Sequence, residues 1–163
     1  MAKVAVALPV LFLLVGCAGG PEALMRRHAY EGSRMPASEL ATVFARWDGG
    51  GGEQTYICGV DGKGYRQRGP LSPCPSVVYL TPGPHALEVL HELGFSTATN
   101  SIALRALAGR AYEVKATVYD SKHTRFSWRE MPPGFVLTYR DLAPSYFSKG
   151  DRPNRPVSPD APD

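Results

Sequence analysis

Glycine and proline interrupt this chain along its whole length. The 163 residues include 17 Gly and 15 Pro, so that roughly one residue in five disfavours regular structure. Such a chain favours short strands joined by many turns over a helix bundle. The hydrophobic fraction of 44% and the charged fraction of 20% are typical of a globular domain and exclude a disordered chain.

Between the turns, apolar and polar residues alternate with the period of two that a half-buried strand shows. In residues 111–119, Tyr112 and Val114 would face the core while Glu113 and Lys115 face outward. Turn signals recur about every 8–15 residues, as in a small sandwich. We therefore predict a mainly β fold, a small antiparallel β-sandwich of about seven to eight short strands with a signal peptide and flexible tails. The expected strands are 40–47, 56–60, 76–80, 85–93, 101–108, 111–119, 126–131 and 135–142.

Two of these segments also have helical character. Residues 86–93 and 101–108 are rich in helix-forming side chains, and each is followed by a glycine of the kind that ends helices. We predict strands because both segments lie between tight turns and both also alternate with period two. Local propensity is a weak signal that tertiary context overrides.

The first sixteen residues have the organisation of a secretory signal peptide. Lys3 precedes the uncharged stretch 4–15. As a helix of about 12 residues, that stretch would be about 18 Å long, well short of the roughly 30 Å of a bilayer core. We therefore predict a signal peptide over residues 1–16 and no transmembrane anchor.

The signal peptide ends in Leu14-Val15-Gly16-Cys17, which resembles the lipobox of bacterial lipoproteins. The resemblance implies that Cys17 becomes the mature N-terminus and carries a lipid with fatty acids such as palmitate. It also implies an anchor in the cell outer membrane with the domain facing the periplasm, because Ala18 replaces the aspartate that retains such proteins at the inner membrane. The alternative is a plain secretory signal with an incidental cysteine.

After Cys17 the chain is long enough for one domain, not two. We expect a lipidated tether over residues 17–35, a β-sandwich over 36–147 and a Pro-rich disordered tail over 148–163. The tether would be solvated, although its basic residues 26–28 could instead touch anionic lipid. Prolines recur at every third position near the end of the tail, which leaves a polyproline II ligand as the alternative to disorder.

The stretch 77–118 contains a strand pattern, the turn Pro82-Gly83, a second strand pattern and then Gly109-x-x-Tyr112. This order is similar to that of PEGA-like β-domains in small proteobacterial lipoproteins. The resemblance implies a β-sandwich. It implies no catalytic residues, and most such lipoproteins have no assigned activity.

If Cys17 is lipidated, Cys58 and Cys74 are left as an even pair sixteen positions apart. Cysteine pairs in an oxidising compartment form disulfides, so a Cys58–Cys74 bond is predicted. The alternative is a metal site that combines the two cysteines with His85 and His91. Their spacing lacks the close Cys-x-x-Cys pair of zinc sites, so no metal is expected.

The predicted disulfide would frame a loop rich in cations. Lys63, Tyr65, Arg66 and Arg68 lie inside this loop. Pinning the ends of a loop lowers the entropy that is lost when the loop orders on a partner. These four residues are therefore the candidate partner contact, and a merely solvated reversal is the alternative.

No catalytic or cofactor motif accompanies this organisation. The sequence lacks Gly-x-Ser-x-Gly, Ser-x-x-Lys and a phosphate-binding Gly-rich loop, and His91-Glu92 lacks the second histidine of a zinc-protease helix. The net charge of +3 gives no electrostatic case for a nucleic-acid partner. We predict a non-catalytic structural or accessory contact module without cofactor, attached to the membrane by its N-terminal lipid and meeting an envelope protein or glycan.

A periplasmic small-ligand or glycan-binding domain is the alternative function. Trp47, Tyr56, Tyr65 and Trp128 could form a platform on which sugar rings stack. Exposure of Trp47 and Tyr65 on one concave face would favour ligand binding, whereas their burial would favour a contact module. An enzyme is the third and least supported function.

Overall fold

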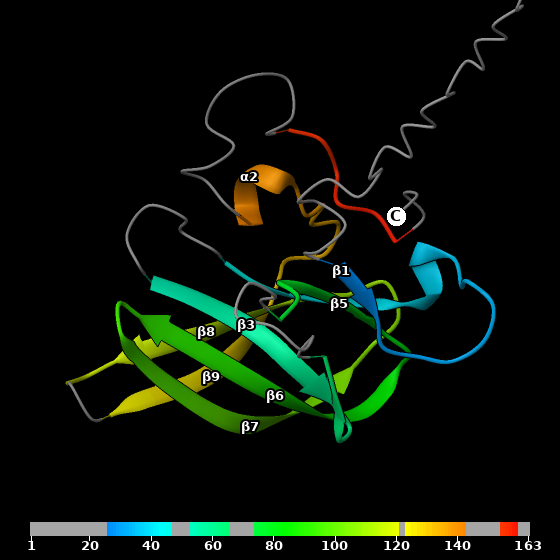
Figure 1. Ribbon diagram of the computed structural model, residues 1–163. Helices are drawn as coiled ribbons and strands as arrows, with labels where there is room; N and C mark the ends of the chain where they lie inside the picture. The colour runs from blue at the N-terminus through cyan, green and yellow to red at the C-terminus, as the bar shows by residue number, and fades with distance from the viewer. Residues whose placement is uncertain (1–25, 47–52, 66–73, 121–122, 143–153, 160–163) are drawn as a thin grey trace, which may run out of the picture.

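The computed structural model describes residues 26–46, 53–65, 74–120, 123–142 and 154–159 (Figure 1). Over these residues the chain is mainly β, with nine strands arranged in two sheets. The prediction of a small β-sandwich is confirmed. Two of the nine strands, β1 and β4, have only three and two residues, and the sequence pattern did not indicate them.

The five-stranded sheet has the order β1-β5-β2-β8-β9. Its neighbouring strands run antiparallel except for two parallel pairs, β1 with β5 and β2 with β8. The sheet is thus mixed, not purely antiparallel as expected. Its strands are β1 (Arg26–His28), β5 (Val77–Leu80), β2 (Ala41–Ala45), β8 (Ala111–Val118) and β9 (Thr124–Glu130).

The four-stranded sheet has the order β4-β3-β6-β7, and all its pairs are antiparallel. A register shift between Ile57 and Gly59 marks a bulge in β3, and bulges of this kind bend a strand locally. β6 and β7 are each eleven residues long and form one extended hairpin (Figure 1). The strands are β4 (Lys63–Gly64), β3 (Glu53–Val60), β6 (Gly83–Leu93) and β7 (Ser96–Ala106).

The hairpin of β6 and β7 contains both segments with helical character. Residues 86–93 lie in β6, and most of 101–108 lies in β7, so the prediction of strands is confirmed. The pairing of β6 with strands on both of its sides outweighs the helical preference. Leu87 and Leu104 are buried on the inner face of the hairpin.

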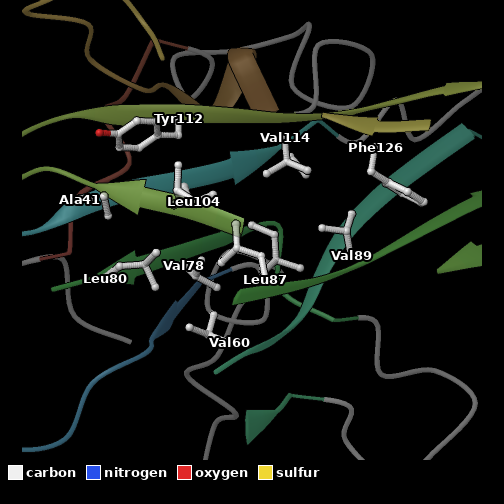
Figure 2. Packing of buried hydrophobic residues seen from close by; sticks show 14 residues of the cluster. Ala41, Val60, Val78, Leu80, Leu87, Val89, Leu104, Tyr112, Val114 and Phe126 are labelled. Carbon is white, nitrogen blue, oxygen red and sulfur yellow. The ribbon is translucent and has the colours of Figure 1, made fainter. Parts of the chain in front are cut away.

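The main core lies between the two sheets. Figure 2 shows side chains such as Val114 of the five-stranded sheet and Val89 of the four-stranded sheet pointing into the same space. Tyr112 and Val114 face this core as the alternation in 111–119 predicted. The fully or nearly buried members are Ala41, Val43, Ala45, Ile57, Val60, Val78, Leu80, Leu87, Val89, Leu104, Ala106, Tyr112 and Val114, and Phe126 lies at the margin.

A second core lies on the outer face of the five-stranded sheet. Phe44 and Tyr79, which point away from the main core, are completely buried beneath a C-terminal segment. This cover consists of 131–142, including the short helix α2 (Tyr139–Leu142), together with 154–159. The five-stranded sheet is therefore buried on both faces here, which explains why β2 and β5 are apolar at almost every position.

The predicted strand over residues 135–142 is wrong. This segment runs along the sheet as an irregular chain and then turns into α2. Thr138 and Asp141 close the turn, because the backbone N–H of Thr138 donates to Asp141 Oδ2 over 2.9 Å and its hydroxyl donates to the same oxygen over 2.7 Å. The turn places Leu137 and Leu142 on the second core, where both are buried.

The predicted boundaries of the tether and the tail are also wrong where the structure describes them. Residues 26–28 form β1, and Arg26 is buried with its Nη1 donating to the carbonyl oxygen of Ser158 over 2.9 Å. Val157 is buried in the second core and its N–H donates to the carbonyl oxygen of Leu137 over 2.8 Å. The folded domain therefore includes Arg26 and reaches Pro159, and the signal peptide, Cys17 and the outer parts of the tether and tail lie outside the described residues.

Candidate functional site

The predicted disulfide between Cys58 and Cys74 is confirmed. Both cysteines are buried on the outer face of the four-stranded sheet, where they pack with Tyr56 and Leu90. Because both sulfurs are used in this bond, the alternative of a metal site built on the two cysteines is wrong. Among the described residues, no group of three metal-binding side chains comes together.

The loop that the disulfide frames begins with a tight turn. Asp61 and Gly62, both with positive φ, join β3 to β4. Lys63 is exposed and forms an ion pair with Glu31. Tyr65 is half-buried against the main core, and its pKa is raised by this burial and by the charge of Asp61. These two candidate contact residues therefore differ in exposure: Lys63 is open to solvent, whereas Tyr65 packs partly against the main core.

Arg66, Arg68 and Trp47 lie outside the described residues, so the four-residue partner contact stays a prediction. The three other aromatic residues of the sugar platform occupy separate surroundings. Tyr56 is buried beside the disulfide, and burial together with the charge of Glu92 raises its pKa to about 12. Trp128 lies on β9, where its Nε1 donates to the carbonyl oxygen of Ala103 on β7 over 2.9 Å. These residues do not share one exposed face.

His85, near the start of β6, has a structural role. Its Nδ1 lies 2.7 Å from Asp61 Oδ2, and its Nε2 lies 2.8 Å from the carbonyl oxygen of Thr81. Asp61 Oδ1 also accepts a hydrogen bond from the backbone N–H of Ala86 over 2.9 Å. His85 therefore joins two turns.

The most unusual surface lies where two hairpins end side by side. Gly94 and Phe95 form the turn between β6 and β7, and the side chain of Phe95 is fully exposed. Tyr119, which follows β8, is 64% exposed, and Leu93 is 42% exposed. We call Leu93, Phe95 and Tyr119 the tip surface. Sequence reasoning missed it, although an aromatic residue directly after a turn glycine was a signal.

A hollow of about 200 Å³ opens between the two hairpin ends. We call it the tip hollow. Its wall combines apolar side chains with hydroxyl groups and one carboxylate, that of Asp120, which also binds His123 Nδ1 over 2.8 Å and so closes the β8–β9 turn. The lining residues are His91, Leu93, Ser96, Thr97, Ala98, Val118, Asp120 and Thr124.

His91 is the most buried polar residue of the tip hollow, with 3% of its side chain exposed. Its Nδ1 lies 3.0 Å from Thr55 Oγ1, which fixes the ring. Its Nε2 has no hydrogen-bond partner, and the nearest carboxylate oxygen, Glu53 Oε1, lies 3.7 Å away. A buried nitrogen without a hydrogen-bond partner costs free energy, so His91 is an unsatisfied polar group in the wall of the hollow.

The fold and these features define a class: a two-sheet β domain with an apolar tip surface around a small hollow. Comparisons with known proteins give no match: no protein-family model, no curated protein and no solved structure matches the chain. In the part of the chain that the structure describes, no helix combines the length and the apolar character that crossing a bilayer requires.

Proposed function

We propose that this protein is a lipid-anchored lipoprotein of the bacterial cell envelope whose domain acts by contact with a partner, without catalysis or cofactor. The lipobox at residues 14–17 supports the anchor. The first described strand begins at Arg26, and nine residues of extended chain span about 30 Å at most. A lipid on Cys17 would therefore hold the domain close to the bilayer surface.

The residue after the lipidated cysteine supports the compartment. Ala18 is not the aspartate that retains lipoproteins at the inner membrane. We place the protein at the outer membrane with its domain in the periplasm. The Cys58–Cys74 disulfide agrees with this placement because disulfides persist in oxidising compartments.

The observation that carries the contact function is the tip surface. A fully exposed Phe95 at a tight turn contributes nothing to the core, and turns of this kind are usually polar. Exposed aromatic and aliphatic side chains that gather at one place mark interaction sites, where aromatic residues are enriched. We propose that the tip surface inserts into an apolar pocket of an envelope protein.

The position of the tip surface suits a tethered protein. In Figure 1 the two hairpin ends lie at the left, whereas β1 and the segment that follows it lie at the right. A domain held through the chain that precedes β1 would therefore keep Phe95 and Tyr119 at its far end. A partner could be reached there without release from the bilayer.

Metabolic labelling tests the anchor. Cells of a diderm bacterium that express the chain would be fed an alkyne-bearing palmitate, and the labelled protein would be compared with Cys17→Ser. We expect label and membrane fractionation for the natural chain and loss of both for the variant. Equal labelling of the two chains would overturn the anchor and leave the contact function to be judged separately.

Site-specific photo-crosslinking in intact cells tests the contact. A photoreactive amino acid at position 95 is expected to give one discrete protein adduct, and the same adduct is expected to weaken when Tyr119→Ser is added. Position 105 on β7 is the control, because Arg105 is exposed but lies away from the tip surface. The same adducts from positions 95 and 105 would contradict a contact through the tip.

Binding of a small ligand is a second candidate function, and the hydroxyl groups of Ser96, Thr97 and Thr124 in the wall of the tip hollow favour it. The tip hollow is smaller than the roughly 300–1,000 Å³ of ordinary ligand sites, so it fits a single small polar group of a ligand or glycan. Titration of monosaccharides such as N-acetylglucosamine, followed by the ¹⁵N signals of His91, tests this function. Unchanged signals at saturating sugar would exclude the sugars tested.

A further inference from the structure

One end of the outer face of the five-stranded sheet carries a group of cations. Beyond the second core, none of the described segments covers β8 and β9, and the register places Glu113 opposite Arg129 and Thr117 opposite Arg125. Arg46 follows β2, which runs beside β8. We call the open part of the sheet the basic face. Its charged members are Arg46, Glu113, Lys115, Arg125 and Arg129.

Glu113 is buried at the centre of this face, with 1% of its side chain exposed. Arg46 Nε donates to its Oε1 over 2.6 Å, and Arg129 Nε donates to its Oε2 over 2.5 Å. Lys115 Nζ lies 3.6 Å from Oε2. Burial raises the pKa of Glu113, but the hydrogen bonds from Arg129 and Arg46 and the nearby positive charges outweigh burial, so that the pKa lies below its usual value.

The cations around this carboxylate remain open to solvent. The side chains of Arg46, Lys115 and Arg129 are 42%, 47% and 55% exposed. Glu113 occupies only part of the donors of each guanidinium, because an arginine has five N–H groups in a fixed fork. One buried carboxylate thus orients two guanidinium groups without neutralising the face, and exposed Arg125 adds a further positive charge.

A hollow of about 410 Å³ lies beside these residues. Arg46, Lys115 and Arg129 line it, together with Thr55 and two carboxylates. One carboxylate is that of Glu113, which the arginines already bind. The other belongs to Glu53, which is half exposed and lies 3.7 Å from His91 Nε2. Three cations therefore line one hollow together with two carboxylates. Arginines bind Glu113, whereas the ion pair that the described residues show for Glu53 is with His91.

We propose that the basic face binds a phosphate group at this hollow. Phosphate offers several acceptor oxygens, and the planar fork of arginine matches them in pairs, which a single lysine cannot do. Glu113 acts as a positioning residue that holds Arg46 and Arg129 in place and does not touch the ligand. The phosphate comes either from a free anion or from the headgroup of an anionic lipid. The site is independent of the tip surface and of lipidation at Cys17.

Titration of the full chain with inorganic phosphate at low ionic strength tests the site. The Nε–H signals of Arg46 and Arg129 in NMR spectra are expected to shift together and to saturate. Arg46→Gln is expected to weaken phosphate binding about tenfold, as the loss of one charge-assisted pair would. Arg105→Gln on β7, which also removes one exposed arginine, is the matched control and should leave the affinity unchanged. Absence of saturation, or equal weakening in the control, would overturn the proposal.

A second variant guards against loss of the fold. Lys115→Gln removes a half-exposed cation that is 3.6 Å from Glu113, so it leaves the buried hydrogen bonds intact. It should weaken phosphate binding while the thermal unfolding midpoint stays the same. Arg46→Lys keeps the charge and loses the fork, and it should restore only part of the affinity. Full affinity in both variants would show that these side chains do not bind phosphate.

Vesicles distinguish the two sources of phosphate. The full chain would be added to vesicles of phosphatidylcholine with and without phosphatidylglycerol, because any attachment through the apolar leader occurs on both. A preference for phosphatidylglycerol that Arg46→Gln removes and Arg105→Gln preserves would assign the headgroup. Saturable phosphate binding without this preference would assign a free anion. A chain that shows neither response has no phosphate site at this face.

Discussion

The outer face of the five-stranded sheet is built in two different ways on neighbouring strands. Around Phe44 and Tyr79 the face is apolar, and the C-terminal segment covers it completely. On β8, the register places the buried Glu113 beside Phe44, and the side chains of Arg46 and Arg129 cover this carboxylate instead. One half is held by buried apolar area and the other by ion pairs with long side chains. The difference shows that a buried position on this face needs a cover, and that the cover can come from a distant segment or from neighbouring cations.

The largest expected effect comes from the apolar half. Leu142→Ala removes a completely buried side chain from the second core, and such changes cost about 2–5 kcal/mol of unfolding free energy. Urea unfolding followed by circular dichroism measures this loss. Val136→Ala, at a position that is 60% exposed, is the control and should change stability by less than about 0.5 kcal/mol. Equal effects of the two changes would mean that α2 is not a cover.

Glu113→Gln tests the charged half. The amide keeps the shape but loses the charge that two arginines hydrogen-bond, so we expect a loss of about 1–3 kcal/mol at pH 7. Glu130→Gln is the matched control. Glu130 pairs with Arg110 over 3.1 Å, but both side chains are more than one-third exposed, so its loss should cost under about 1 kcal/mol. A stable Glu113→Gln protein would contradict the role assigned to the carboxylate.

The two halves should also differ in their response to acid. The pKa of Glu113 is lower in the folded state than in the unfolded chain, where glutamate has a pKa of about 4.3. Its contribution to stability is therefore complete above the unfolded pKa and is lost as pH falls through the folded pKa. Unfolding measured from pH 7 down to about pH 3 should show the Glu113→Gln effect shrinking as the pH falls. The Leu142→Ala effect should stay nearly constant, and parallel profiles would refute the distinction.

The smallest effect is expected for Lys115→Gln. Its Nζ lies 3.6 Å from Glu113 Oε2 and the side chain is half exposed, so the ion pair should contribute less than about 0.5 kcal/mol. The same urea unfolding measures it. A loss as large as that of Glu113→Gln would mean that the three cations act as one unit and that the arginines alone do not hold the carboxylate.

The main core could be predicted from the sequence because its signal is local. Tyr112 and Val114 alternate with polar residues, and the turn residues Asp61 and Gly62 mark the end of β3. The Cys58–Cys74 bond followed from counting cysteines. The strand and turn signals come from residues that lie close together in the chain. The disulfide could be predicted because the chain has few cysteines that can pair.

The second core and the basic face could not be predicted because their partners are distant. Glu113 was expected to face outward, and it does leave the main core, but Arg46 buries it from 67 positions away. Leu137 and Tyr139 are two positions apart, as on one face of a strand. In the structure, however, they belong to the irregular segment and to α2, which cover the second core. The tip surface was missed for another reason: whether Phe95 is exposed depends on how distant segments are placed, and in the described part of the chain none covers it, which no local pattern records.

The short strand β1 is a weak attachment point, so the length of chain between residue 17 and the folded domain can change. Three residues pair with β5, and Arg26 also holds the carbonyl oxygen of Ser158, so these few bonds fix where the chain enters the fold. If Cys17 carries a lipid, tension on the anchor would act first on the β1–β5 pairing and on the hydrogen bond of Arg26. Peeling the chain back to Leu40 would free about fourteen residues, or about 50 Å of slack, while the strands from β2 onward keep their pairing. The distance between the bilayer and the body of the molecule would then depend on load.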